Sequence, residues 1–552
     1  MLLPKDVQFE PYKIKSVETL AFPAPLEPKA IELRQRILAE SKYNLFNIPA
    51  ELVTVDLLTD SGTGSMSQDQ WASIMLGDES YAQATSFRRF EQSIRSVIGD
   101  EFHIIPTHQG RAAENILFYV LNNFSDELFH KSGVRRRRVL INSFFDTTAA
   151  NVSLHGRITP SEWESVRESA LEISKMTHPE SDVERVSYSL IRQIENKVRK
   201  EVLILPNQLV VDQKHPENYE HSIFGGNIDL DKLEKQLSDT STIQDVMIVM
   251  LTATNNTGGG LPVSLNNIKS VREMVDHYSR DLPPLTDDLP PLMFFMDACR
   301  FAENAWYIQQ YEPNQGDRSV AEIAREMFSY VDGCTMSAKK DGMANIGGFL
   351  ATRHQTLMRK CYEYMVEVEG FYTYGGLAGR DLEAIAVGMV EGVDDNRVNH
   401  RIKQVHQLWD MLRQEGVPVK SPCGGHGVFL KGREFWSVNG KPLILPENLP
   451  GHLLAVELFA RYGIRSCEIG TIMFGDVDPV TGKVNQVAPD EDYVRLAIPR
   501  RTYTASHMEY VAASIVDLYK NRESISCAGM EFTWRSASLP HFLSHFKPID
   551  KN

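Results

Sequence analysis

Residues 246–275 read VMIVMLTATNNTGGGLPVSLNNIKSVREMV, and this stretch decides the predicted fold. Its opening run, VMIVML, is apolar, short and rich in β-branched residues, which indicates a buried strand. A helix is predicted from Ser264 onward, because Ile268, Val271 and Val275 fall on one helical face. The segment therefore predicts a strand followed by a crossover helix.

A second apolar run, residues 292–296, follows this helix and ends at Asp297. The two runs and the helix between them form a βαβ pattern, which is typical of a layered α/β protein with a mainly parallel sheet. In such sheets ligands bind beyond the carboxyl ends of the strands. The polar residues that follow both runs therefore predict a ligand site at that edge.

Length and composition indicate a globular chain with more than one domain, since it has 552 residues, of which 42% are hydrophobic and 24% charged. We expect an N-terminal arm with part of a small domain (1–60), a large domain (61–370) and a C-terminal small domain (371–552). Two segments look inserted into this plan. One is a helical insertion at about 157–200, and the other is the proline-rich surface connection DLPPLTDDLPP at 281–291.

The charge balance argues against a nucleic-acid partner, since 58 basic and 73 acidic residues give a net charge of −15. The basic run 135–138 is interpreted as the solvated edge of a strand. We expect no membrane span and no signal peptide, and we expect a cytoplasmic protein, because no uncharged stretch reaches about 18 residues. The six cysteines are scattered, so we expect free thiols.

The string PTHQGRAAENILFYVL places Gln109, Gly110 and Arg111 directly before a helical pattern. Amides at a helix N-terminus, a glycine that permits close approach and one arginine suit a bound phosphate. The alternative is an ordinary helix start with a surface arginine.

Two further strings carry side chains suited to a carbonyl cofactor. Asp297 ends a buried run, so it needs a partner, either a pyridinium N–H or an ion pair with Arg300. In SAKKDGMANIGG, Lys339 and Lys340 are adjacent, and a lysine near a second cation can lose its proton and form a Schiff base. The alternative is a pair of surface charges.

Eight strings together resemble the β-eliminating lyases, the family of tryptophanase and tyrosine phenol-lyase among the fold-type I pyridoxal-phosphate enzymes. They are LLTDSGTGSMSQDQW, GDESY, PTHQGRAAEN, MDACRFAEN, SAKKDGMANIGG, TYGGLAGRDLEA, GGHGVFL and RLAIPRRTYT. The resemblance covers the chain from about Pro11 to Phe542, apart from the two inserted segments. It implies an aspartate-aminotransferase-like large domain with a mainly parallel sheet, and a smaller α+β domain.

The resemblance also implies site residues and the cofactor pyridoxal 5′-phosphate. The implied catalytic residues are Lys340, Tyr81, Asp297, Asp146 and His541. The implied cofactor-binding residues are Gln109, Gly110, Arg111, Phe145, Asn256, Asp297, Arg300, Ser337 and Lys340. The implied substrate-binding residues are Thr59, Ser61, Asn256, Ile469 and Arg500, and Arg500 would bind the substrate carboxylate. The implied monovalent-cation site, normally for potassium, consists of Gly62, Glu79 and Asn345.

The leaving group is the point on which the two relatives differ. The general sequence of the quoted strings is more similar to that of tyrosine phenol-lyase. That enzyme binds the phenol oxygen with an arginine in a Met-Glu-Arg-Gly string, and the corresponding residue here is Ile469. Ile469, Asp146 and His541 match tryptophanase instead, and an apolar residue leaves a buried phenol oxygen unpaired. We therefore expect cleavage of tryptophan to indole, pyruvate and ammonia. Two alternatives remain, cleavage of tyrosine to phenol and elimination from another β-substituted amino acid. The resemblance also implies a homotetramer built as a dimer of dimers.

Overall fold

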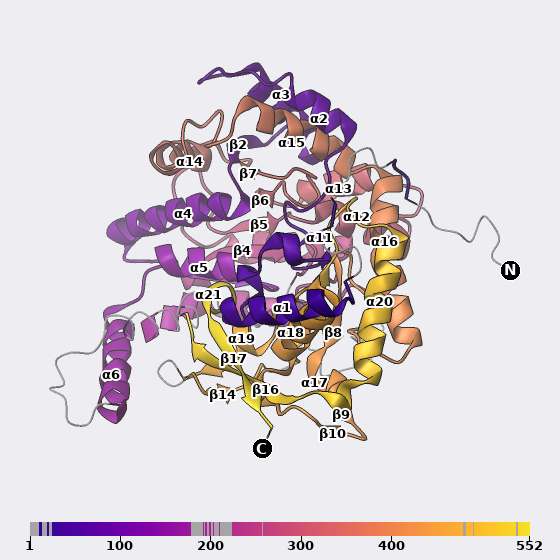
Figure 1. The fold of residues 1–552 in the computed structure, drawn as a ribbon. Coiled ribbons are helices and arrows are strands. Elements are labelled where there is room, and N and C mark those ends of the chain that lie inside the picture. Colours follow the sequence, from indigo (N-terminus) through magenta and orange to yellow (C-terminus); the bar gives the residue numbers. More distant parts are fainter. Residues whose placement is uncertain are drawn as a thin grey trace. The chain divides into compact units, whose positions relative to one another are not determined.

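Strand β4 (Val246–Thr252) is buried along its whole length and lies inside a six-stranded sheet. The strands follow the order β2-β7-β6-β5-β4-β3, and Figure 1 labels this order from β2 to β4. The other strands are β2 (His103–Thr107), β3 (Arg138–Ile141), β5 (Met293–Asp297), β6 (Gly333–Ser337) and β7 (Gly348–Thr352). Strands β3 to β6 run parallel, and β7 is antiparallel to both of its neighbours. The prediction of a mainly parallel α/β sheet is confirmed.

The predicted βαβ unit is present. Helix α11 (Leu265–Ser279) begins after Ser264, whose side-chain oxygen accepts a hydrogen bond from the Asn267 N–H at 3.1 Å. The apolar face of this helix is fully buried at Ile268, Val271 and Val275. Strand β5 pairs in parallel with β4, so both carboxyl ends reach the same edge of the sheet.

The computed structural model describes residues 10–13, 19–20, 25–177, 191, 194–195, 198–199, 202–203, 209, 223–256, 258–478, 482–488, 491–536 and 539–551, without the side chains of Asp146 and 173–177. The chain divides into two compact units. Unit 1 consists of Met1–Asp60, Glu164–Asn196 and Ile402–Asn552, and unit 2 consists of Ser61–Trp163 and Lys197–Arg401.

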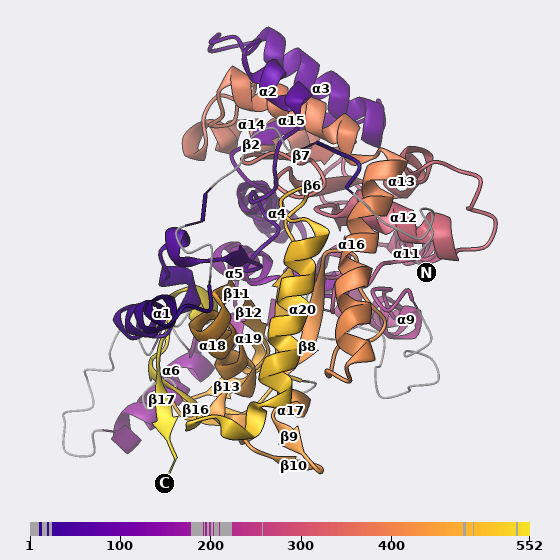
Figure 2. The same cartoon turned by 45° about the vertical axis from the view of Figure 1, so that its right-hand side comes forward.

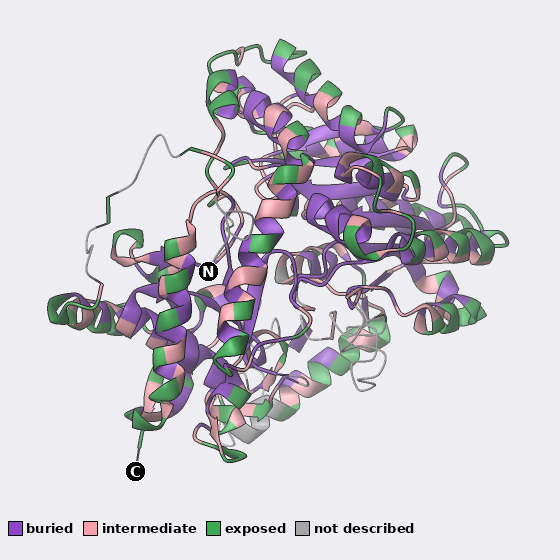
Figure 3. Cartoon of the chain, turned by 90° about the vertical axis from the view of Figure 1, so that its right-hand side faces the viewer, coloured by how far each residue is buried: buried purple, intermediate pink, exposed green. Residues whose placement is uncertain are grey.

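Unit 2 has helices on both faces of its sheet. Its helices are α2 (Gln68–Ile74), α3 (Thr85–Ile98), α4 (Gly110–Ser132), α5 (Asp146–His155), α9 (Leu230–Ser238), α10 (Thr240–Asp245), α11, α12 (Phe301–Tyr311), α13 (Val320–Ser329), α14 (Gln355–Val368) and α15 (Gly379–Gly392). Helices α4 and α14 lie on one side of the sheet and α11, α12 and α13 on the other (Figures 1 and 2). Nearly every residue of the strands is buried as a result, whereas the helices expose their outer faces (Figure 3).

Unit 1 is an α+β unit built around a buried helix, α18 (Pro450–Tyr462). Its main sheet is antiparallel, in the order β12 (Cys467–Ile469), β15 (Tyr493–Ala497) and β8 (Gly427–Lys431). The shorter strands are β1 (Val55–Asp56), β9 (Ser437–Val438), β10 (Lys441–Pro442), β11 (Ile464–Arg465), β13 (Asp476–Val477) and β14 (Val484–Gln486), with the antiparallel pair β16 (Cys527–Trp534) and β17 (His545–Asp550). The remaining helices are α1 (Pro28–Glu40), α17 (Gly432–Phe435), α19 (Thr471–Phe474), α20 (Ala505–Lys520) and α21 (Pro540–Leu543).

Helices α6 (Pro160–Thr177) and α16 (Asp395–Gln414) run across the boundaries between the two units. Helix α6 occupies the first part of the region at about 157–200 for which the sequence predicts helices. Most of the rest of that region, 178–190 included, lies outside the described residues. Within the described residues no helix is long and apolar enough to cross a membrane, and all six cysteines are free thiols.

The arginine run before β3 is not a solvated edge, so that interpretation is wrong. Arg136 is fully buried and donates to the Pro283 carbonyl at 2.5 Å. Arg137 is paired with Glu162 and Asp245 at 2.9 and 3.0 Å. The proline-rich segment 281–291 is likewise tied down, because its Leu285 and Leu289 side chains belong to the core of unit 2. The sequence shows the charges of the arginine run, but it does not show that a distant backbone carbonyl accepts a hydrogen bond from Arg136.

Candidate functional site

The carboxyl ends of β4, β5 and β6 meet at one edge of the unit 2 sheet. Thr252, Asp297 and Thr335, one from each strand, stand opposite one another in register. Backbone hydrogen bonds continue past the strands, because Ala253 N donates to Asp297 O at 3.0 Å and Ala298 N donates to Thr335 O at 2.9 Å. Asp297 is therefore held at the strand end on both sides.

A cradle lies where α4 begins. Gln109 is the N-cap residue and Gly110 the first residue of the helix. A Cβ atom at Gly110 would lie 2.8 Å from the Cβ of Ser337, the last residue of β6, so only glycine fits there. The first N–H groups of a helix have no partner within the helix, and here they stand beside a hydroxyl and next to Arg111. This donor set fits a phosphate dianion, as the sequence predicts.

The two lysines follow β6 in a turn, and both are half-buried. Burial, together with the charges of Lys340 and Arg111, lowers the pKa of Lys339. Asp341 fixes this turn, because its buried carboxylate accepts from the Ala302 N–H at 2.8 Å and so caps the start of α12. The sequence pattern assigns Asp341 no role, although it directly follows the lysine pair. Three cations, Arg111, Lys339 and Lys340, therefore gather at this edge of the sheet.

Cys299 lies beside the same carboxylate. Its backbone N–H donates to Asp297 Oδ1 at 3.2 Å. Desolvation by the surrounding protein and the charge of Asp297 raise the pKa of the Cys299 thiol to about 12, although the charge of Lys340 opposes the rise. The thiol is therefore protonated at neutral pH.

Glu114 is a second residue that sequence reasoning missed. It lies on α4, is 5% exposed and interacts electrostatically with Asp297. Burial first, and the charge of Asp297 second, raise the pKa of Glu114 to about 7, although hydrogen bonds from Thr148, Thr147 and Asn151 oppose the rise. The signal was present in the string GRAAEN, because Glu114 follows Gly110 by one helical turn.

The residues predicted to surround the cofactor ring come from three loops of unit 2. Phe145 is half-buried and is the N-cap residue of α5. Asp146 is the first residue of α5, and its side chain lies outside the described part of the chain. Asn256, which follows β4, is 9% exposed, and Arg300, the N-cap residue of α12, is 3% exposed.

The predicted carboxylate-binding arginine lies in unit 1 and has a carboxylate partner there. Arg500 Nη1 is 3.0 Å from Asp60 Oδ2, and both side chains are almost fully buried. This ion pair fixes the orientation of the guanidinium group. Thr59 precedes Asp60 in unit 1, whereas Ser61 is the first residue of unit 2.

Ile469 and His541 also belong to unit 1. Ile469 ends β12 and is 1% exposed. Nε2 of His541 lies 2.8 Å from Sγ of Cys467, two residues before Ile469. Burial first, and then the charge of Arg495, lower the pKa of His541 to about 3, so this imidazole is neutral at physiological pH.

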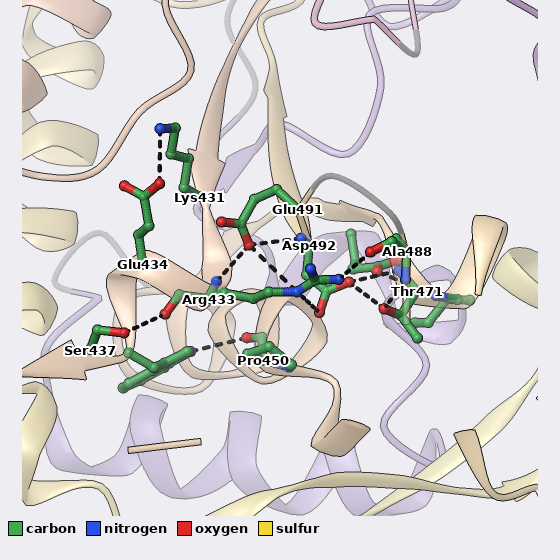
Figure 4. A network of polar contacts seen from close by, with 12 residues as sticks. Lys431, Arg433, Glu434, Ser437, Pro450, Thr471, Ala488, Glu491 and Asp492 are labelled. Carbon is green, nitrogen blue, oxygen red and sulfur yellow. Dashed lines mark hydrogen bonds and ion pairs between the residues drawn. The ribbon is translucent and has the colours of Figure 1, made fainter. Parts of the chain in front are cut away.

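A polar network, shown in Figure 4, fixes the chain immediately after Ile469. Asp492 is fully buried and accepts from both the backbone N–H of Thr471 at 2.7 Å and its hydroxyl at 2.5 Å. Arg433 Nε lies 3.4 Å from Asp492 Oδ2, and its Nη2 donates to the Ala488 carbonyl at 2.8 Å. The start of α19 is thereby locked in place, and with it the end of β12.

The residues predicted for the cation site are brought together only in part. Asn345 Nδ2 donates to the Gly62 carbonyl at 3.1 Å, so these two lie side by side. Glu79 is 3.5 Å from Arg380, and both side chains are mostly exposed. Tyr81 is 69% exposed and its ring lies 5.6 Å from that of Phe371. The described contacts therefore hold Gly62 and Asn345 together but pair Glu79 and Tyr81 with other residues.

Comparison with known proteins gives matches over almost the full chain. A model of the family described as beta-eliminating lyase matches residues 56–514. A tryptophanase from Salinibacter ruber is 40% identical over 543 residues, which cover 98% of this chain and 96% of that protein. A tyrosine phenol-lyase from Symbiobacterium sp. is 36% identical over 540 residues, which cover 98% of both proteins.

The fold also has a counterpart among solved structures. A Sphingomonas wittichii serine palmitoyltransferase matches with a TM-score of 0.51 at 10% sequence identity, over 92% of this chain and 100% of that one. This likeness concerns the fold alone, which is that of fold-type I pyridoxal-phosphate enzymes. The sequence matches carry the assignment further: the chain belongs to the β-eliminating lyase family and is a pyridoxal-phosphate-dependent lyase.

Proposed function

We propose that this protein cleaves L-tryptophan to indole, pyruvate and ammonia. The observation that carries the proposal is Ile469, which is 1% exposed and locked by the network around Asp492. At this place tyrosine phenol-lyase has the arginine that binds the phenol oxygen. An isoleucine offers no hydrogen bond to a phenol oxygen, and leaving such an oxygen unpaired in a buried pocket is costly.

Pyridoxal phosphate fits the site in unit 2. The phosphate would bind at the start of α4, held by the Gly110 amide region, Ser337 and Arg111. Asp297 would pair with the pyridine nitrogen, and Phe145 would stack on the ring. When bound, this cofactor supplies an electron sink for the pair released as the α-proton leaves.

The remaining roles belong to side chains of the protein. Lys340 is the amine that holds the cofactor and then takes the α-proton from the substrate. It stands beside Lys339, a second basic side chain at this edge of the sheet. Arg500, oriented by Asp60, binds the substrate carboxylate. The family resemblance assigns Asp146 and His541 to the leaving-group side of the substrate, and the neutral state of His541 allows it to accept a hydrogen bond.

We propose that the active site is completed by a second copy of the chain within a homotetramer. Tyr81 is largely exposed, and so are Trp71, Met75 and Leu76 in and after α2, at 59%, 84% and 64%. Apolar side chains exposed together mark a surface for association. On such a surface Tyr81 and Glu79 serve the neighbouring copy, where Glu79 joins Gly62 and Asn345 around a potassium ion.

The direct test of the function is a substrate panel. Enzyme saturated with pyridoxal phosphate is incubated with L-tryptophan, L-tyrosine or S-methyl-L-cysteine, and indole, phenol and pyruvate are measured. We expect indole and pyruvate in equal amounts from tryptophan, with kcat/KM about tenfold or more above that for tyrosine, because a phenol oxygen lacks a partner. Lys340→Ala, the control, should release neither product. Phenol from tyrosine without indole from tryptophan would overturn the proposal.

A second prediction concerns the residue that selects the leaving group. Ile469→Arg should raise the kcat/KM ratio of tyrosine to tryptophan by about tenfold, because a guanidinium supplies the missing hydrogen bond. Ile469→Val, which stays apolar, is the matched control and should leave the ratio within about twofold of the original. An equal ratio for all three proteins would show that Ile469 does not contact the leaving group.

A third prediction tests the phosphate cradle. Gly110→Ala should weaken the affinity of the apoenzyme for pyridoxal phosphate by about tenfold or more, because the added Cβ would lie 2.8 Å from Ser337 Cβ. Gly316→Ala is the control, since a Cβ there would meet only one atom, at 3.9 Å. Fluorescence titration with the cofactor measures both constants. Equal affinities would place the phosphate elsewhere.

A fourth prediction concerns the cation. Exchange of potassium for sodium at constant ionic strength should lower kcat, and Glu79→Gln should reduce the difference between the two ions, because one carboxylate ligand is lost. Steady-state rates in the two chloride salts measure this. Indifference of the original enzyme to the exchange would remove the cation from the proposal.

A further inference from the structure

The inference concerns Glu114, a buried carboxyl group that neither the sequence motifs nor the proposed mechanism uses. Glu114 lies one helical turn beyond Gly110 on α4 and is 5% exposed. A carboxyl group is costly to bury unless it is neutral or well paired. Its position therefore requires an explanation in terms of its partners.

The partners of Glu114 all come from the first two turns of α5. Thr148 Oγ1 donates to Glu114 Oε1 at 2.5 Å, and Thr147 Oγ1 and Asn151 Nδ2 lie 3.3 and 3.4 Å from Oε2. Asn151 Nδ2 also donates to the Arg111 carbonyl at 3.2 Å. These contacts join the start of α4 to the start of α5.

Each of these two helix starts carries part of the predicted cofactor site. Helix α4 begins at the phosphate cradle, and Phe145 caps α5. The side chains of α5 that bind Glu114 are uncharged, and their hydrogen bonds favour its ionised form. Asp297, at the end of β5, is the charged group whose field acts on Glu114, and it raises the pKa of Glu114.

We propose that Glu114 is a positioning residue for the cofactor: it holds Phe145 in register with the phosphate cradle, and its charge acts through Asp297 on bound pyridoxal phosphate. The inference rests on the proposed cofactor site. When Glu114 is ionised, a second negative charge near Asp297 stabilises protons on the cofactor. When Glu114 is neutral, this extra field is absent.

The experiment separates these two parts with two substitutions. Glu114→Gln keeps the size of the side chain and one of its two acceptor oxygens but removes its charge. It should bind pyridoxal phosphate within about threefold of the original affinity. The pH midpoint of the visible absorbance of the loaded enzyme should fall by at least about 0.3 pH units, because the field of a nearby carboxylate is lost.

Glu114→Ala removes the contacts as well as the charge, and it should weaken cofactor affinity by about tenfold or more. Thr148→Val, which removes the shortest of these hydrogen bonds, should weaken affinity by a smaller factor without moving the midpoint. If Glu114→Ala fails to fold, Glu114→Gln and Thr148→Val still decide the matter. Both measurements use cofactor titration and absorbance, so they do not depend on which amino acid is the substrate.

Two controls make the outcomes distinct. Glu383→Gln changes another buried carboxylate of unit 2, one bonded to Ser86 and Arg89, and it should alter neither the affinity nor the midpoint. If Glu114→Gln and Thr148→Val both behave like Glu383→Gln, the inference about Glu114 is overturned. Lys340→Ala tests the cofactor site itself, because unchanged visible absorbance in that variant would show that the site is misassigned. If Lys340→Ala loses the visible absorbance but the Glu114 variants keep the original affinity and midpoint, the inference about Glu114 is overturned and the proposed cofactor site stands.

Discussion

The register between β4, β5 and β6 is the constraint on which the site depends. It places Thr252, Asp297 and Thr335 in one row, and each strand then releases its loop at the same edge. A slip of one residue would turn every side chain of a strand to the opposite face of the sheet. Because β4 is buried on both faces, it is the fit of side chains of particular size and shape against their neighbours that opposes such a slip. Core packing therefore sets the place of the reactive groups.

The sequence was most informative where local pattern and chemistry coincide. The run 246–251 and the helix after Ser264 follow from periodicity alone, and both are present. The start of a helix at Gly110 follows from the pattern, and the structure adds the reason for a glycine there, since a Cβ atom would lie 2.8 Å from that of Ser337. The family membership followed from strings spread over the chain, and the comparisons confirm it.

The sequence was least informative about partners that are distant along the chain. The pairing of Arg500 with Asp60 joins residues 440 positions apart, and no local pattern indicates it. The neighbouring arginines make Arg136 look like a surface charge, yet its guanidinium group donates a hydrogen bond to the carbonyl of Pro283. Glu114 was overlooked for a related reason, since its partners lie on another helix. The assignments of Ile469, His541 and the cation ligands remain predictions that rest on the family resemblance.

The protonation state of the Cys299 thiol decides how readily this sulfur reacts beside Asp297. Sulfur reacts with aldehydes, alkylating agents and peroxides chiefly as the thiolate. Burial and the charge of Asp297 hold the pKa of Cys299 well above its ordinary value, so the thiol form prevails at neutral pH. The charges of Asp297 and Lys340 act on the pKa of this thiol in opposite directions, and burial together with Asp297 prevails. A cysteine therefore stands beside Asp297 with its sulfur held in the less nucleophilic thiol form.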